Sequence, residues 1–210
     1  MANITSFLPR VRLEIVGCID AIIVSYLRDS MIEFCDKSWY WQETLPTINV
    51  IAGTALYLIP APADALISDI ISVRHNDIKV SPTNEDAMDD LSSAWRSQTG
   101  AQAIAWIASE RNLVTLYPIP SVAGTLKVKA ALKPSQTATT IPDQIFNHYL
   151  DPVAAGAKWK LMAMPGMEWS NPSLSLYYRD IYMRGISDAK MSAIRGYNRS
   201  TMTINPSGMW

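Results

Sequence analysis

Cysteine is scarce in this chain of 210 residues, and its scarcity excludes two kinds of cross-link. The two cysteines, Cys18 and Cys35, are predicted near opposite ends of one helix. They would lie about 25 Å apart at 1.5 Å per residue, which is too far for a disulfide. With two histidines and no Cys-x-x-Cys motif, the sequence predicts no structural zinc. We expect reduced, buried thiols, as in an intracellular protein.

Long apolar runs and an excess of charge of either sign are also missing. Asp20, Arg28 and Asp29 interrupt the most apolar segment, so no membrane-spanning helix is predicted, and the N-terminal residues lack the pattern of a secretion signal. Lys and Arg together number 18 and Asp and Glu number 19. This balance gives no electrostatic argument for binding nucleic acid or a membrane.

Motifs of enzymes and nucleotide-binding proteins are absent too. The sequence has no Gly-x-Ser-x-Gly elbow, no phosphate-binding loop ending in Gly-Lys-Ser/Thr, no dinucleotide glycine fingerprint and no His-Glu-x-x-His. We therefore predict a protein that is not an enzyme, with no catalytic, cofactor-binding or metal-binding residues.

Two groups of ionisable residues resemble sites only superficially. Residues 83–95 are predicted to form a short acidic helix capped by Thr83. Its carboxylates are Glu85, Asp86, Asp89 and Asp90. A metal site is one interpretation, but a solvated acidic face is favoured, because carboxylates in a first helical turn stabilise the helix dipole. His75 and His148 have no nearby nucleophile or second ligand, and we interpret both as ordinary surface or half-buried residues.

Aromatic residues and methionine, in contrast, are abundant: the chain has seven Trp, nine Tyr and ten Met. These residue types are enriched at protein interfaces, so the composition favours assembly. Trp39 and Trp41 are predicted on one face of a strand over residues 39–45. Packing in the core or a subunit interface is the favoured interpretation, and an exposed pair that docks a sugar or a partner chain is the alternative.

Three helices are predicted from apolar spacing and capping residues. The first covers residues 20–37 with Asp20 as its cap, and the second starts near Phe146. The third is capped by Ser170 or Asn171, has Pro172 in its first turn and ends at Gly196. The predicted buried faces are Ile23, Leu27, Met31 and Phe34; Phe146, Leu150, Val153, Ala154, Ala157, Leu161 and Met164; and Leu174, Tyr178, Ile181, Gly185 and Ala189.

Alternation with a period of two predicts short strands elsewhere. Residues 10–16 alternate Val11, Leu13 and Ile15 with charged residues, which predicts a strand or an extended arm. Segments 102–107, 113–117 and 125–133 are predicted to form a three-stranded meander. Further strands are predicted at 39–45, 48–51, 55–59, 66–74 and 78–80. Lys127 and Lys129 form an outward row that either faces nucleic acid or, as we favour, protects a solvated sheet face.

An ordered series of short motifs carries a resemblance to a known family. The series is Tyr117-Pro118-Ile119-Pro120, Ala123-Gly124-Thr125-Leu126-Lys127-Val128, Leu132-Lys133-Pro134-Ser135, Ile141-Pro142, Ala155-Gly156-Ala157, Met164-Pro165-Gly166-Met167-Glu168-Trp169-Ser170-Asn171-Pro172 and Tyr177-Tyr178. Upstream, Leu27-Arg28-Asp29, Glu33-Phe34-Cys35 and Gly53-Thr54-Ala55-Leu56-Tyr57-Leu58 also fit. The chain resembles the head-to-tail adaptor (connector, neck) proteins of tailed bacteriophages, of the podovirus type.

We predict an α+β fold in which N- and C-terminal helices pack as a small bundle with an inserted β-rich module. The expected domains are a discontinuous helical domain of residues 1–37 and 141–195, a β-rich module of 38–140, and an extended C-terminal arm of 196–210. The arm contains apolar side chains that are costly to leave in water, so we expect it to order against a partner, with a frayed terminus as the alternative. The candidate partner-binding residues are Arg195, Tyr197, Arg199, Met202, Ile204, Met209 and Trp210.

The resemblance implies a structural role in the neck of a virion, with assembly in the host cytoplasm. It implies a homo-oligomeric, dodecameric ring beneath the portal protein, bound to a tail or nozzle protein, around a channel through which DNA passes without sequence-specific binding. Two alternatives remain: a module with Trp39 and Trp41 that binds a host-surface glycan or protein, and a small hydrolase.

Overall fold

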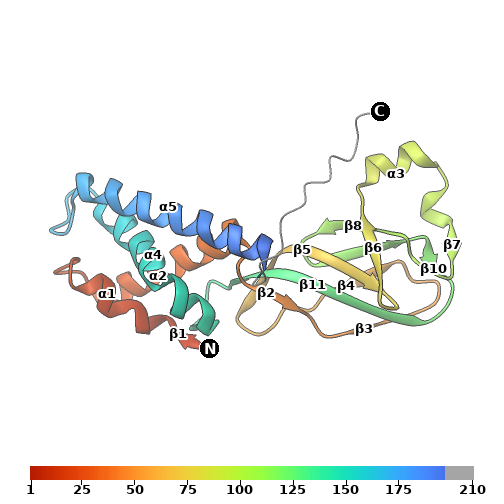
Figure 1. The fold of residues 1–210 in the computed structure, drawn as a ribbon, viewed down its shortest axis with the longest axis horizontal. Helices are drawn as coiled ribbons and strands as arrows, with labels where there is room; N and C mark the ends of the chain where they lie inside the picture. The colour runs from red at the N-terminus through yellow and green to blue at the C-terminus, as the bar shows by residue number, and fades with distance from the viewer. Residues whose placement is uncertain (197–210) are drawn as a thin grey trace.

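A computed structural model describes residues 1–196, and it confirms the predicted mixture of helices and strands. The long helices gather at one end of an elongated molecule, and a curled sheet with the short helix near residues 85–91 forms the other end, as Figure 1 shows. The N-terminus lies where the two parts meet. A single large cluster of buried side chains runs through both parts, so the helices and the sheet share a core.

Three long helices form the helical part: α2 (Asp20–Ser38), α4 (Asp143–Met162) and α5 (Pro172–Arg195). Each of them packs against the other two, and α1 (Leu8–Arg12) and the 3-10 helix η1 (Ile4–Phe7) pack against α2 and α4. The chain therefore brings residues 4–38 against residues 143–195 to enclose one side of the core.

Local sequence explains where the long helices begin and end. The Asn171 side chain accepts a hydrogen bond from the Leu174 amide (3.1 Å), and Gly196, with a φ of 65°, ends α5. Helix α2 differs from the prediction, because its cap is Ile19 and Asp20 lies in the first turn, where a carboxylate stabilises the helix dipole. Cys18 thus precedes α2; both cysteines are free thiols, Cys35 buried and Cys18 half-buried.

The small residues predicted for a shared core lie between α4 and α5. Residues 154–157 are all buried, and Tyr182 of α5 packs against Gly156, where a Cβ would lie 2.7 Å from the ring. Tyr182 is fully buried, and its hydroxyl donates to the Ser30 carbonyl oxygen (2.7 Å). The sequence prediction placed Ile181 on this buried face, but Ile181 is half-exposed and Tyr182 takes the central position.

The prediction of a strand or an extended arm at residues 10–16 is wrong, because the first part of this segment is helix α1. Val11 and Ile15 are buried while Leu13 is 81% exposed, so the buried positions are four residues apart, which is the helical spacing. Pro9 lies in the first turn of α1, where no amide donor is needed.

The main sheet has eight strands in the order β2-β11-β5-β6-β8-β9-β4, with β3 also paired to β11. The strands are β2 (Gln42–Thr44), β3 (Ile48–Val50), β4 (Leu56–Leu58), β5 (Ala65–His75), β6 (Ile78–Pro82), β8 (Ala105–Glu110), β9 (Leu113–Tyr117) and β11 (Gly124–Pro134). The predicted meander is only half right. Strands β8 and β9 pair as expected, but β11 pairs with β5, and β5, β6 and β8 separate it from β9 in the strand order.

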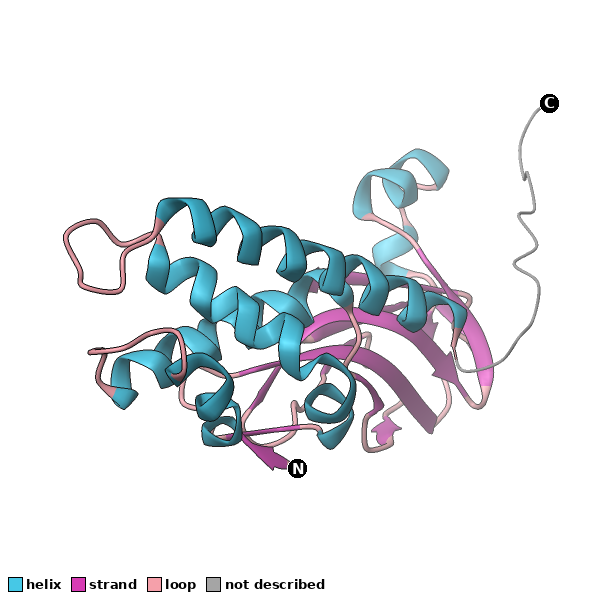
Figure 2. Ribbon diagram, turned by 60° about the vertical axis from the view of Figure 1, so that its left-hand side comes forward, coloured by secondary structure: helices cyan, strands magenta, loops and turns pink. Residues whose placement is uncertain are grey.

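The sheet curls because its two ends are joined by a short loop. Strands β3 and β4 lie at opposite ends of the strand order, yet only residues 51–55 separate them. The Tyr57 hydroxyl donates to the Thr54 carbonyl oxygen (2.8 Å) and accepts from the Ile51 amide (3.2 Å). These bonds hold the two ends near each other and give the curved surface seen in Figure 2.

Short elements complete the fold. The acidic helix is shorter than predicted, because α3 (Glu85–Leu91) is capped by Asn84 and is followed by the 3-10 helix η2 (Trp95–Ser97). Two small strand pairs lie outside the main sheet: β1 (Ala2–Asn3) with β12 (Thr140–Ile141), and β7 (Thr99–Gly100) with β10 (Ile119–Pro120).

One carboxylate ties the helical part to the sheet. Asp36, near the end of α2, accepts hydrogen bonds from Lys133 Nζ of β11 (2.7 Å) and Ser68 Oγ of β5 (2.5 Å). Arg111 lies 3.4 Å from the same oxygen. Partial burial opposes ionisation of Asp36, but the hydrogen bonds and the nearby cations outweigh it and lower the pKa of this carboxyl group.

Candidate interaction surfaces

The acidic residues of α3 serve the local fold. Within residues 1–196, no three His, Cys, Asp or Glu side chains are placed so that they could hold a metal ion. Asp89 accepts a hydrogen bond from Trp95 Nε1 (2.7 Å) and pairs with Arg96 (2.5 Å). These contacts fasten η2 to α3. Among the described helices, none combines the length and the apolar character needed to cross a bilayer.

His75 is a buried structural residue, which corrects its interpretation as a surface or half-buried histidine. It is fully buried at the end of β5, and its Nδ1 accepts a hydrogen bond from the Ala103 amide (3.0 Å). Burial lowers the pKa of this imidazole, so the neutral ring is favoured. His148 is exposed, in agreement with the interpretation from the sequence.

The end of the helical part farthest from the sheet exposes an apolar surface, which we call the helical tip. Two loops meet there: the loop after α1 and the loop between α4 and α5 (Figure 1). They touch at Gly17, where a Cβ would lie 2.9 Å from Glu168 Oε2. The exposed apolar residues of the helical tip are Leu13, Val16, Ile19, Met167, Leu176 and Tyr177.

An ionic network beneath the helical tip fastens the loop after α1 to α4 and α5. The buried Lys158 of α4 donates to Glu14 Oε1 (2.8 Å), and the Tyr178 hydroxyl of α5 donates to the other carboxylate oxygen. Lys158 Nζ also lies 4.8 Å from the centre of the Tyr178 ring. Burial and the adjacent Glu14 carboxylate raise the pKa of Tyr178 to about 12. Hydrogen bonds and an ion pair therefore hold the loop of the helical tip against α4 and α5.

A second apolar surface lies at the free edge of the sheet. Among residues 1–196, strand β4 pairs with β9 on one side only, and Leu56 and Leu58 are 52% and 63% exposed while Tyr57 between them is buried. In an antiparallel pair, alternate residues direct their backbone groups away from the partner strand. The backbone N–H and C=O groups of Tyr57 are directed toward β9, so those of Leu56 and Leu58 point away from it. We call these two residues the β edge.

The predicted pair Trp39 and Trp41 does not share a strand face. Trp39 has a positive φ of 52° and ends α2, with Lys190 Nζ 5.5 Å from the ring centre. Trp41 is only 5% exposed and belongs to the main core, as the favoured interpretation expected. The exposed aromatic pair on which the glycan-binding alternative rested is therefore absent.

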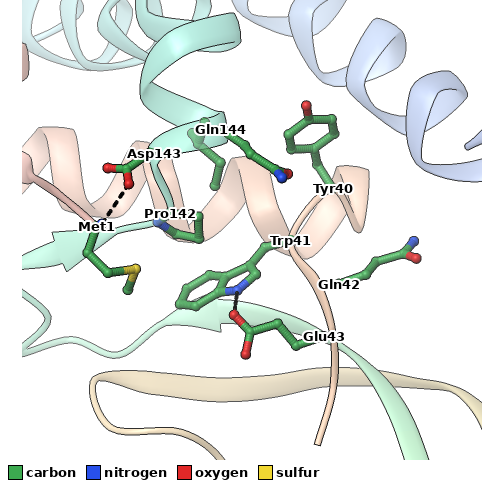
Figure 3. A pocket seen from close by; sticks show the side chains of 9 residues that line it. Met1, Tyr40, Trp41, Gln42, Glu43, Pro142, Asp143 and Gln144 are labelled. Atoms are coloured by element: carbon green, nitrogen blue, oxygen red, sulfur yellow. Dashed lines mark hydrogen bonds and ion pairs between the residues drawn. The ribbon is translucent and has the colours of Figure 1, made fainter. Parts of the chain in front are cut away.

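A cavity of about 310 Å³ adjoins Trp41 at the junction of the helical part and the sheet (Figure 3). The Trp41 Nε1 donates to Glu43 Oε1 (2.8 Å) on one side, and the Met1 ammonium pairs with Asp143 Oδ2 (2.8 Å) on the other. The first turn of α4 supplies the opposite wall through Gln144 and Ile145.

The lysines of β11 are mostly engaged in ion pairs. Lys127 Nζ lies 2.6 Å from Asp77 Oδ1, and Lys133 Nζ lies 2.7 Å from Asp36 Oδ1, while Lys129 is exposed. Pairing with carboxylates leaves little free positive charge, which favours the interpretation of this row as a solvated sheet face.

Of the predicted partner-binding residues, the structure places one. Arg195 is exposed at the end of α5. The other six lie outside the described residues: Tyr197, Arg199, Met202, Ile204, Met209 and Trp210. The helical tip was not predicted from the sequence. Met167, beside Pro165 and Gly166, was a usable signal, because an apolar side chain in a short loop can rarely reach the core.

Comparison with known proteins identifies the family. A search of curated proteins found no match. A family model described as "SU10 adaptor protein" matches residues 2–205, which is nearly the whole chain. This match confirms the resemblance to phage head-to-tail adaptors and supports a structural, adaptor role. The chain therefore belongs to the SU10 adaptor protein family.

Proposed function

We propose that this protein forms a closed ring of about twelve copies beneath the portal of a phage head and joins it to the tail. The family match carries the proposal, because it covers the helices and the sheet together. The ring surrounds the channel through which DNA leaves the head. The overall charge of −1 suits this passage, since tight phosphate binding would hinder ejection.

The exposed surfaces support an assembly role. The helical tip and the β edge expose apolar side chains at different places on one protomer, as a protein with several contact surfaces would. A ring needs unlike faces that meet head to tail, which such a protomer provides. Arg195 and the arm of residues 197–210 supply a further contact, to the portal or to a neighbouring subunit.

The test is assembly on purified portal rings of the same virus. The full chain should attach as a ring of about twelve copies, measured by native mass spectrometry and electron microscopy. A chain truncated after Gly196 should lose attachment, because the arm multiplies weak contacts through avidity. A full chain that never attaches, or attaches as isolated single copies, overturns the proposed ring; unimpaired attachment of the truncated chain removes the arm from it.

A further inference from the structure

Two cavities adjoin each other at the junction of the helices and the sheet. The cavity beside Trp41 has a volume of about 310 Å³, and a second of about 260 Å³ lies next to it. Both are lined by Tyr40, Gln42 and Gln144, so these three residues lie where the two cavities meet, and we call the two adjoining cavities the junction groove.

The junction groove begins where the described chain ends. Its second cavity is lined by Ser192, Ala193 and Gly196, so residue 197 continues from the wall of the groove itself. The remaining fourteen residues, 197–210, can span roughly 45 Å when extended at about 3.3 Å per residue. The segment is therefore long enough to extend across both cavities.

The far cavity matches the segment in charge and polarity, whereas the near cavity carries the exposed Lys129. Arg199 is the sole charged side chain between residues 197 and 210. The far cavity carries Glu43, which is exposed, bonds to Trp41 and forms no ion pair with any residue from 1 to 196. Apolar walls surround it: Met1, Trp41, Pro142 and Ile145. Met202 and Ile204 offer apolar side chains for such walls, three and five residues beyond Arg199.

We propose that residues 197–204 bind the junction groove of their own protomer, with Arg199 at Glu43. This intramolecular site holds the arm in the unassembled protein, and a partner that takes up the arm must first displace it. The binding is a property of the isolated chain; only the displacement step rests on the proposed adaptor function.

Photo-crosslinking of the full chain tests the site. We would replace Met202 by the photoreactive residue p-benzoylphenylalanine, irradiate an equal mixture of ¹⁴N- and ¹⁵N-labelled protein, and locate the adducts by mass spectrometry. We expect adducts at groove residues such as Trp41, Glu43 or Gln144, within single chains and at a yield independent of protein concentration. Adducts elsewhere in the fold overturn the proposal, and adducts between light and heavy chains show that a second copy occupies the groove instead.

Charge exchange tests the pairing of Arg199 with Glu43. Glu43→Arg should lower the crosslink yield roughly two- to fivefold, as expected for an exposed ion pair, and adding Arg199→Glu should restore it. Glu110→Arg, at an exposed glutamate of β8, is the matched control and should change nothing. If Glu43→Arg unfolds the chain, Glu43→Gln keeps the acceptor for Trp41 and should still lower the yield. An unchanged yield in the charge variants contradicts the site, whether or not the protein forms a ring on portals.

Discussion

At the scale of single residues, glycine determines how closely α4 and α5 approach. A Cβ at Gly185 would overlap the Pro152 ring of α4, and the chain around this proline is already bent, with non-helical φ and ψ at Tyr149. Such a contact has little room to relax, because the overlapping atoms belong to a ring that is fixed to the backbone.

We therefore expect Gly185→Ala to destabilise the protein by on the order of 1 kcal/mol. Overpacking costs about 1–3 kcal/mol, and alanine recovers at most about 1 kcal/mol of helix propensity. Urea unfolding followed by circular dichroism measures the change. Arg184→Ala, at an exposed position of the same helix, is the control and should stay within about 0.5 kcal/mol of the parent protein. A Gly185→Ala variant as stable as the parent would show that α4 and α5 separate freely.

At the scale of elements, Asp36 joins α2 to β5 and β11. Its folded pKa is lowered, so its contribution to stability is present above the ordinary value of 3.8 and is lost as the pH falls through the lower, folded value. Because the Asp36 side chain is 37% exposed, we expect Asp36→Asn to cost about 1 kcal/mol at pH 7.

The same pH dependence supplies the measurement for Asp36. The free energies of unfolding of Asp36→Asn and of the parent protein should differ fully at pH 7, begin to converge as the pH falls below 3.8, and meet only below the lowered folded pKa, where the Asp36 carboxyl group is uncharged in both states. Asp180→Asn, at an exposed position of α5, should show no such convergence. A difference that stays constant down to pH 3 would mean that charge plays no part in this connection.

Elements with strong local signals were predictable from the sequence. Helix α5 has a capping Asn171, Pro172 in its first turn and Gly196 at its end, so its bounds follow from adjacent residues. Residues 10–16 have two conflicting periods, since Val11 and Ile15 fit a helix and Leu13 fits only a strand. Whether Leu13 is buried decides between the helical and the strand period, and the sequence does not show this because burial depends on the tertiary fold.

Strand order and the burial of His75 required the fold itself. Strand β11 follows β9 in the chain but pairs with β5, some fifty residues earlier, and no local pattern encodes such a pairing. Asn76 and Asp77, which follow His75, form a turn with φ of 50° and 65°, and turn residues are usually near the surface. The burial of His75 comes from Ala103, which the distant strand β8 brings close.

At the scale of the whole molecule, the family and the α+β fold were predictable, while the surface that this protomer offers to a partner was not. Leu13 and Leu176 are distant in sequence, and the connection between their segments runs through Glu14, which bonds to Lys158 of α4 and Tyr178 of α5. If this tip is an assembly contact, a charged side chain there should weaken binding to the partner and leave the free energy of unfolding unchanged.

We expect the double variant Leu13→Asp and Leu176→Asp to weaken attachment to portal rings at least about tenfold, because apolar contacts at an interface centre contribute more than about 1.4 kcal/mol. Sedimentation of portal rings with labelled protein measures attachment, and urea unfolding should give the parent stability, since both side chains are 60% exposed or more. Leu91→Asp is the control: Leu91 is 71% exposed on α3, away from the tip. Equal attachment of the double variant and the control would remove the tip from the assembly contacts and leave the β edge and the arm to hold the ring.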